Sequence, residues 1–165
     1  MTEKLLVLEL GSNLGNRRGN LQQACLMIEE SIGYVTSVSS IYETEPWGYD
    51  STIGFLNQCL VVWSDMDPGR ILDRIHLIEE NLGRHERSHD YIDRLIDIDI
   101  LFYGDMVLSR SDLQIPHSKI QDRRFSLVPL AEILPDFVHP ILRKKISTLL
   151  SECRDKGKVK RIETG

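Results

Sequence analysis

The sequence predicts an α+β fold, a ferredoxin-like α/β plait in which an antiparallel sheet carries helices on one face. Three observations support this class. The first hundred residues have the order strand, helix, strand, strand, helix, strand. Apolar residues recur every three or four positions in the expected helices. The linker between the second and third strands is too short and too polar for the crossover helix of a doubly wound parallel sheet, which is the alternative.

Four elements are expected before residue 65: strand 4–10, helix 17–32, strand 34–42 and strand 55–64. Gly33 suits the end of the helix. A polar loop of about residues 43–54 separates the last two strands. The βαββαβ core and short C-terminal additions are expected to form a single domain over residues 1–165.

The second helix is expected to begin at Asp67 and Pro68, an N-cap aspartate followed by a proline in the first turn. Gly83 ends its apolar pattern, and a polar loop leads to the stretch RLIDIDILFY, residues 94–103. Beyond Gly104 we expect an extended piece, DLQIPH, and helices near 125–134 and 146–153. The polar tail is either a short strand or a frayed end.

Charge and composition exclude several classes of protein. The formal net charge is -5, which disfavours general nucleic-acid binding because that activity needs a basic face. The longest apolar runs are too short to span a membrane, and the first residues resemble a strand instead of a signal peptide. We therefore expect a cytoplasmic protein. Its three widely spaced cysteines predict reduced thiols, with no disulfide and no zinc ribbon.

Two aspartates stand side by side in the stretch RLIDIDILFY. Strand alternation puts Asp97 and Asp99 on one face, about 6.5–7 Å apart, and Ile96, Ile98 and Ile100 on the face that packs on the helices. Two carboxylates at this separation repel by roughly 2–3 kcal/mol at an effective dielectric near 20. A wet, open sheet face would tolerate the pair. A Mg²⁺ ion would instead turn the repulsion into attraction and bridge to phosphates, and spacing alone leaves both readings open.

Cationic residues flank this pair in the sequence. Arg84 and Arg94 border the preceding loop, and His117 and Arg123 follow on another loop. Phosphoryl transfer depends on charge neutralisation and positioning, so guanidinium groups beside a metal suit a triphosphate. Each arginine alone is equally consistent with a surface charge. The sequence contains neither GxxxxGK[ST] nor GxGxxG, so the common nucleotide-binding folds are not indicated.

Several motifs together resemble one family: LGSNLGN, YETEPWG, FLN, RLIDIDILFYG, and IPH followed by RRFSLVPLAEI. Their order and residue types are similar to 6-hydroxymethyl-7,8-dihydropterin pyrophosphokinase (HPPK), over about residues 5–140. The resemblance implies an enzyme of folate biosynthesis with the ferredoxin-like fold. Such an enzyme moves the β,γ-diphosphate of ATP onto the hydroxymethyl group of a reduced pterin and releases AMP. Its partners would be these two small molecules, with Mg²⁺ as cofactor.

The resemblance also implies residue roles by position. The expected catalytic residues are Arg84, Arg94, Asp97 and Asp99, and both aspartates are the expected metal ligands. The expected ATP-binding residues are Glu79, Arg84, Arg94, Ile100, His117 and Arg123. The expected pterin-binding residues are Thr44, Trp47, Phe55, Asn57 and Phe125, with Thr44 acting through its backbone. Taken without the resemblance, Glu79 is a solvent-facing carboxylate, and the two phenylalanines are core residues.

One loop departs from the commoner family pattern. HERSHDYIDR, residues 85–94, has Glu86 and Asp90 where cations are often found, and Tyr91 where a tryptophan is common. This composition keeps open a plait-fold module that binds its ligands without chemistry, or an interaction domain that binds neither. His85 and His89 have a spacing that two zinc ligands can adopt on a helix, but no third ligand stands near them. Protein partners are not indicated.

Overall fold

The computed structural model describes residues 2–44, 54–83 and 95–162 of the chain. Its main sheet is antiparallel, and the strands follow the order β5-β1-β4-β3-β8, with β2 also paired to β4. The six strands are β1 (Lys4–Ser12), β2 (Tyr34–Val38), β3 (Ile41–Thr44), β4 (Phe55–Ser64), β5 (Asp97–Tyr103) and β8 (Val159–Ile162). The predicted α+β class is confirmed.

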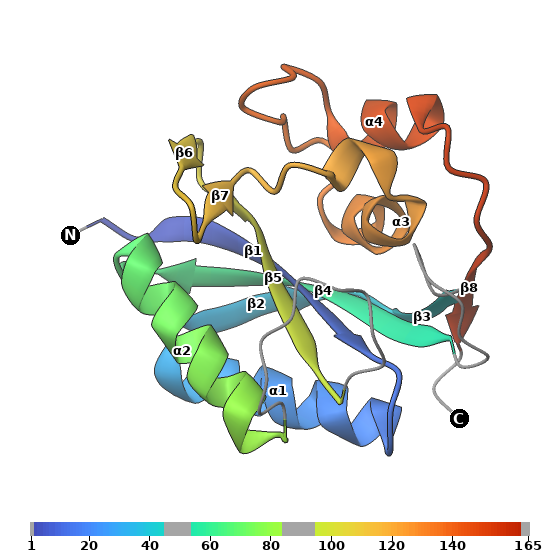
Figure 1. The fold of residues 1–165 in the computed structure, drawn as a ribbon. Coiled ribbons are helices and arrows are strands. Elements are labelled where there is room, and N and C mark those ends of the chain that lie inside the picture. The colour runs from blue at the N-terminus through green and yellow to red at the C-terminus, as the bar shows by residue number, and fades with distance from the viewer. Residues whose placement is uncertain (1, 45–53, 84–94, 163–165) are drawn as a thin grey trace.

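Helices α1 (Arg17–Ser31) and α2 (Pro68–Asn81) cover one face of the sheet (Figure 1). Both begin with a side-chain cap, since Asn16 accepts from the Gly19 N–H and Asp67 accepts from the Gly69 N–H. The main core lies between these helices and the strands. It includes the isoleucines of the alternating strand, namely Ile96, Ile98 and Ile100. The predicted direction of their side chains is therefore confirmed.

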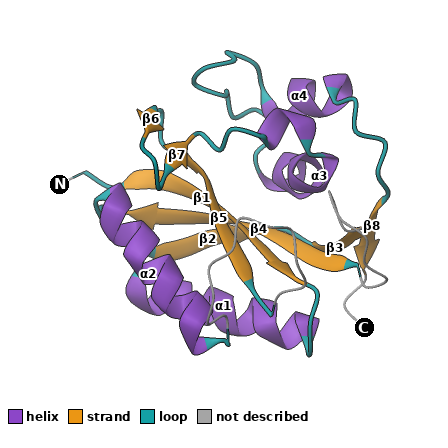
Figure 2. Ribbon diagram, in the orientation of Figure 1, coloured by secondary structure: helices purple, strands orange, loops and turns teal. Residues whose placement is uncertain are grey.

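The C-terminal additions form a second layer on the opposite face. Helices α3 (Arg124–Ile133) and α4 (Ile146–Glu152) lie there (Figure 1). A second core joins Leu127 and Leu130 of α3 to Val7, Cys59 and Phe102 of the sheet. A small hairpin of β6 (Leu108–Ser109) and β7 (Gln114–Ile115) and a short 3-10 turn at Ile120–Asp122 connect β5 to α3 (Figure 2). The sheet is thus covered on both faces along part of its length.

The strand expected over 34–42 is two strands, β2 and β3. The break falls at Ser39 and Ser40, where side-chain hydrogen bonds replace the regular ladder. The Ser39 hydroxyl accepts from the Cys59 N–H, and the Gln58 amide donates to the Ser39 carbonyl. The polar tail, for which two readings were open, forms β8 and pairs with β3.

No helix in the described ranges is both long and apolar enough to cross a membrane. The three cysteines, Cys25, Cys59 and Cys153, are all free.

The alternation along β5 predicts a large stability effect at Ile98. Replacing Ile98 by Ala should lower the free energy of unfolding by about 2–4 kcal/mol, because the residue is buried between the sheet and the helices. Leu77→Ala on α2 is the control, since this side chain is 49% exposed and should change stability by only about 0.5 kcal/mol. Urea unfolding measures both. If Ile98→Ala lowers the free energy of unfolding as little as Leu77→Ala does, the Ile98 side chain does not lie on the helix-facing side of β5.

Candidate active site

Strand β1 brings the two halves of the candidate site together. Gly11 pairs with Asp97 of β5 on one side and with Asn57 of β4 on the other. Neighbouring strands lie about 4.8 Å apart, so the predicted metal aspartate and the predicted pterin amide are separated by only two strand spacings. Glu9, two residues earlier, pairs in the same way with Asp99 and Cys59. All these residues point to the face that carries α3, opposite to the isoleucine core.

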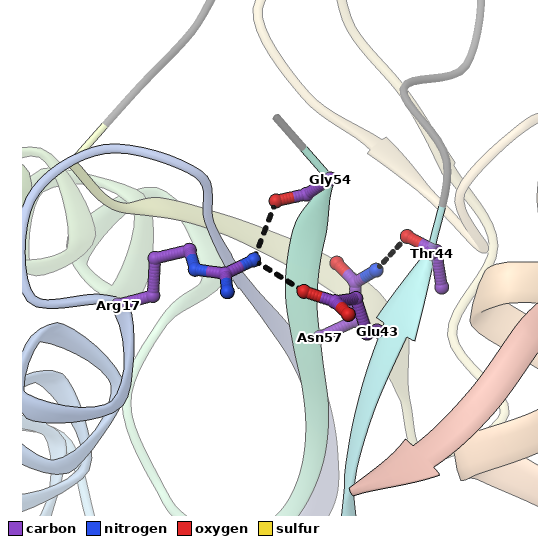
Figure 3. Close-up of polar contacts among 5 residues, drawn as sticks. All are labelled: Arg17, Glu43, Thr44, Gly54 and Asn57. Carbon is purple, nitrogen blue, oxygen red and sulfur yellow. Dashed lines mark hydrogen bonds and ion pairs between the residues drawn. The ribbon is translucent and has the colours of Figure 1, made fainter. Parts of the chain in front are cut away.

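Asn57 and Thr44 form a buried polar pair where β3 ends and β4 begins. The Asn57 Nδ2 donates to the Thr44 Oγ1 at 2.7 Å, and the two residues are 4% and 5% exposed (Figure 3). This bond fixes the orientation of the amide, so its Oδ1 and its second N–H remain for a ligand. A Cβ on Gly11 would meet the Asn57 Oδ1 at 3.0 Å and the Phe55 ring at 3.4 Å. A glycine therefore keeps the space beside the amide open.

Arg17 connects the two strand ends that flank the Asn57–Thr44 pair. Its Nη1 donates to the Glu43 Oε2 at 2.7 Å and to the Gly54 carbonyl at 2.9 Å (Figure 3). Glu43 precedes Thr44 on β3, and Gly54 precedes β4. A Cβ on Gly54 would lie 2.6 Å from the Thr44 carbonyl, so the two strand ends are in close contact. One guanidinium group thus holds together both backbone segments that present the polar pair.

The two predicted pterin phenylalanines come from opposite parts of the chain. Phe55 begins β4 next to Gly11, and Phe125 lies in the first turn of α3. Both are partly exposed, so neither is a fully buried core residue. The Arg123 guanidinium lies over the Phe125 ring, 5.4 Å from its centroid, and Arg123 itself is 7% exposed. A cation and an aromatic face therefore stand together at the start of α3.

Asp97 and Asp99 form an electrostatically unfavourable pair on the partly exposed end of β5. Burial, together with the charges of Asp97 and Glu9, raises the pKa of Asp99 well above its usual value. A divalent cation would relieve this repulsion, and carboxylate oxygens are the ligands that Mg²⁺ prefers. Among the described residues, no three His, Cys, Asp or Glu side chains converge as a metal site. A cation here would therefore complete its coordination with water and phosphate oxygens.

Glu9 is a buried carboxylate on the central strand β1. Its Oε1 accepts from the Ser126 hydroxyl at 3.0 Å, whereas its Oε2 is buried and has no hydrogen-bond partner among the described residues. Burial raises the pKa of Glu9 to about 7, although the Ser126 hydrogen bond and the Arg123 charge act in the opposite direction. A carboxyl in this state costs stability once it ionises.

His117 lies beside β5, because its backbone N–H donates to the Leu101 carbonyl at 3.0 Å. Burial, followed by the charge of Arg123, lowers the pKa of its imidazole to about 4. Its Nδ1 accepts from the Lys119 N–H at 3.2 Å. A neutral ring whose Nδ1 accepts carries its proton on Nε2, so His117 presents one N–H donor at neutral pH.

Of two further predicted ATP residues, Glu79 lies where the sequence pattern alone did not place it, and Ile100 lies where strand alternation placed it. Glu79, read without the resemblance as solvent-facing, is 2% exposed and accepts from the Ile98 N–H at 3.1 Å. Since β5 is the edge of the sheet, Glu79 satisfies a backbone group that the sheet leaves without a strand partner. The Ile100 side chain lies in the main core, on the face opposite to the aspartates.

Three predicted site residues, Arg84, Arg94 and Trp47, lie outside the described residues. The same holds for the zinc alternative at His85 and His89 and for the atypical acidic positions near them. Their roles stay predictions from the sequence.

Sequence reasoning missed Gly11, Glu9 and Arg17 as members of this region. Gly11 carried a signal, because it lies in LGSN and directly follows an apolar strand. Glu9 also carried one, as a lone charge inside the run LLVLEL. Arg17 carried none, since its partners lie 26 and 37 residues away in the chain.

Comparison with known proteins gives one consistent family. A family model described as 7,8-dihydro-6-hydroxymethylpterin-pyrophosphokinase (HPPK) matches residues 7–135. A 2-amino-4-hydroxy-6-hydroxymethyldihydropteridine pyrophosphokinase from Porphyromonas gingivalis is 39% identical over 139 residues, which cover 82% of this chain and 94% of the relative. A protein of the same name from Aquifex aeolicus is 37% identical over 145 residues, covering 88% and 89%.

The fold is similar to that of solved HPPK-DHPS proteins. One such structure, in complex with substrates, has a TM-score of 0.73 and 17% sequence identity, and the match covers 92% of this chain. The chain spans 43% of that longer protein. At this level of identity the likeness concerns the fold alone.

The buried carboxyl of Glu9 predicts a pH-dependent stability difference. Its folded pKa of about 7 lies above the ordinary glutamate value of 4.5, so its contribution to stability is full below pH 4.5 and is lost as pH rises through 7. Glu9→Gln removes this titration. The difference in unfolding free energy between the variant and the parent should therefore be roughly 2–3 kcal/mol more favourable to the variant at pH 8 than at pH 5.

Urea unfolding at the two pH values measures this difference. Glu30→Gln, the same change on the exposed face of α1, is the control and should shift stability equally at both. A Glu9→Gln effect that is also equal at pH 5 and pH 8 would contradict the buried ionisation.

Proposed function

This chain belongs to the 7,8-dihydro-6-hydroxymethylpterin-pyrophosphokinase family, and from that membership we infer that it transfers the diphosphate of ATP to 6-hydroxymethyl-7,8-dihydropterin. AMP is the second product, and the reaction belongs to folate biosynthesis. The observation that carries this function is the pairing across Gly11. It brings Asp97, suited to phosphate chemistry, beside Asn57, suited to a heterocycle, on one face of the sheet.

The pterin is proposed to bind against the buried Asn57–Thr44 pair. A pterin edge carries both donors and acceptors, and the Asn57 amide offers one of each after its bond to Thr44. Phe55 and Phe125 supply faces for a flat ring, which favours offset stacking. The backbone of Thr44 would add further hydrogen bonds. Trp47, which lies outside the described residues, is proposed to complete the apolar lining.

ATP is proposed to bind along β5 and the start of α3. Arg123 contributes a cation, and neutral His117 contributes an Nε2–H donor to a phosphate oxygen. Because the Ile98 N–H points to the outer edge of β5, alternation places the backbone groups of Ile100 at the same edge. Ile100 would contact the nucleotide through these groups, and Glu79 would hold the edge in place. Arg84 and Arg94 are proposed to clamp the phosphates.

Asp97 and Asp99 would hold Mg²⁺, which neutralises phosphate charge and aligns the phosphates when it is bound. The residues of the chain act by positioning and by excluding water. The hydroxymethyl oxygen attacks the β-phosphorus in line, a new P–O bond forms, and the bond between the β-phosphorus and the oxygen bridging to the α-phosphate breaks. No side chain is proposed as a nucleophile, so no covalent enzyme intermediate forms.

We also propose that residues 1–165 act as a single domain, since α3, α4 and β8 pack on the same sheet as the βαββαβ core. A cytoplasmic location stays a proposal from the sequence, whose first residues resemble a strand instead of a signal peptide.

Incubating the protein with ATP, Mg²⁺ and the reduced pterin should yield AMP and the pterin diphosphate. Asp97→Asn should lower turnover by roughly a hundredfold or more, equivalent to about 3 kcal/mol of lost transition-state stabilisation. Asp105→Asn, an exposed aspartate just beyond β5, is the control and should retain full rate. Nucleotide products are separated by chromatography. Formation of ADP, or tight ligand binding with no product, would overturn the assignment and favour a phosphotransferase or a binding module.

Thr44→Val should weaken pterin binding, because the variant removes the acceptor that fixes the Asn57 amide. We expect the KM for the pterin to rise by roughly fivefold, which is about 1 kcal/mol for one hydrogen bond, while the KM for ATP stays unchanged. Thr36→Val, the same change on an exposed part of β2, is the control. Equal shifts in both KM values would indicate that Thr44 acts on the whole fold and not on the amide.

A further inference from the structure

Glu9 lies beneath the first turn of α3, in the middle of the sheet. On β1 it stands between Cys59 of β4 and Asp99 of β5, and it is 4% exposed. Its one side-chain hydrogen bond comes from the hydroxyl of Ser126, itself 1% exposed. The bond joins residues 117 positions apart, so it ties the first strand directly to the helix that begins with Arg124.

The first turn of α3 needs this tie because the helix secures it poorly by itself. The N-cap residue is Arg123, whose guanidinium has only donors and therefore cannot accept from the N–H groups of the first turn. Pro129 lies inside the helix and has no N–H to donate to the carbonyl of Phe125, four residues earlier. A second outside bond, from the Arg124 N–H to Asp155 of the tail, also reaches this turn. Two bonds from elsewhere in the fold, from Glu9 and from Asp155, therefore help to hold the first turn of α3.

Beyond the first turn, α3 is held by apolar contacts and, near its last residues, by Glu132, which accepts hydrogen bonds from Tyr42 of β3 and from Ser40. Leu127 and Leu130 pack on the second core, and apolar contacts hold a helix without fixing its rotation strongly. A hydrogen bond is directional, so the Glu9–Ser126 bond fixes the rotation of the first turn about the helix axis, as Glu132 does near the other end. Successive residues of a helix point about 100° apart. Fixing Ser126 toward the sheet therefore sets the direction of the Phe125 ring next to it.

We propose that Glu9 is a positioning residue for the pterin, which acts through Ser126 to hold the Phe125 ring in its stacking orientation. This role rests on the proposed function, since it assigns Phe125 to the pterin. Glu9 does not act as a further metal ligand, because no three carboxylate, histidine or cysteine side chains converge within the described ranges. A purely structural role fits poorly with an Oε2 that is buried and has no hydrogen-bond partner in the described part of the chain.

Two variants break the same bond with opposite effects on stability. Glu9→Met keeps the approximate volume but removes a buried carboxylate, so its melting temperature should stay the same or rise. Ser126→Ala leaves both oxygens of Glu9 without a partner, so its melting temperature should fall. Both should raise the KM for the pterin by roughly five- to tenfold, with the KM for ATP within about twofold of the parent. The double variant should be no worse than Glu9→Met alone.

Two further variants distinguish loss of the Glu9–Ser126 bond from general destabilisation of α3. Glu9→Gln keeps an acceptor for Ser126 and should restore a pterin KM near that of the parent. Glu132→Gln weakens the anchor at the other end of α3, where Glu132 accepts from the N–H and hydroxyl of Ser40. It should lower the melting temperature and leave the pterin KM within about twofold.

The parent enzyme separates failure of this proposal from failure of the function. If the parent forms no AMP, the proposed function fails. If the parent turns over and Ser126→Ala keeps the parent KM for the pterin, the positioning role is overturned, even where Glu9→Met does not fold. A KM that follows the melting temperature across the series, including Glu132→Gln, would also overturn it.

Discussion

The structure depends on the alternation of side chains along β5. Residues with even numbers from Ile96 to Ile100 close the main core against α1 and α2, while Asp97 and Asp99 between them reach the other face. A carboxylate pair on a strand is unfavourable by itself, because the charges repel and aspartate is a poor strand former. The strand tolerates the pair because its other face is anchored by three buried isoleucines. The stability gained by burying these isoleucines thus offsets the cost of placing two charged residues on the same strand.

The second face of the sheet serves two purposes. Where α3 and α4 cover it, Val7, Cys59 and Phe102 form a second core. Where the cover ends, the same strands present Asp97, Asn57 and the space beside Gly11. The start of α3 marks the boundary, which explains why Arg123 and Phe125 stand at that position. A helix added after the βαββαβ core therefore buries apolar surface and also forms one wall of the site.

The sequence pattern predicted the parts of this fold that depend on residues close to one another in the chain. Strand β4 was expected at 55–64 and has those bounds, because its apolar run and its flanking turns are local signals. The break at Ser39 was not predicted, since it depends on bonds with Gln58 and Cys59 on another strand. Glu79 is buried for a similar reason, because its partner is a backbone N–H on β5. The placement of Asp97 and Asp99 on one face followed from the period-two alternation of a strand, whereas the contacts of Arg17 required the folded chain.

Glu9 combines a feature that is visible in the sequence with contacts that only the folded chain shows. A charge inside a buried strand is a local conflict, because the strand would be more stable with an apolar residue at that position. Such conflicts concentrate at functional sites, where a group is kept for its direction and not for its stability. Here the conflict lies between Asp99, expected to serve the nucleotide, and Ser126, adjacent to the residue expected to stack on the pterin. Through its pairing with Asp99 and its bond to Ser126, this one side chain of the central strand links the residues proposed for the nucleotide to those proposed for the pterin.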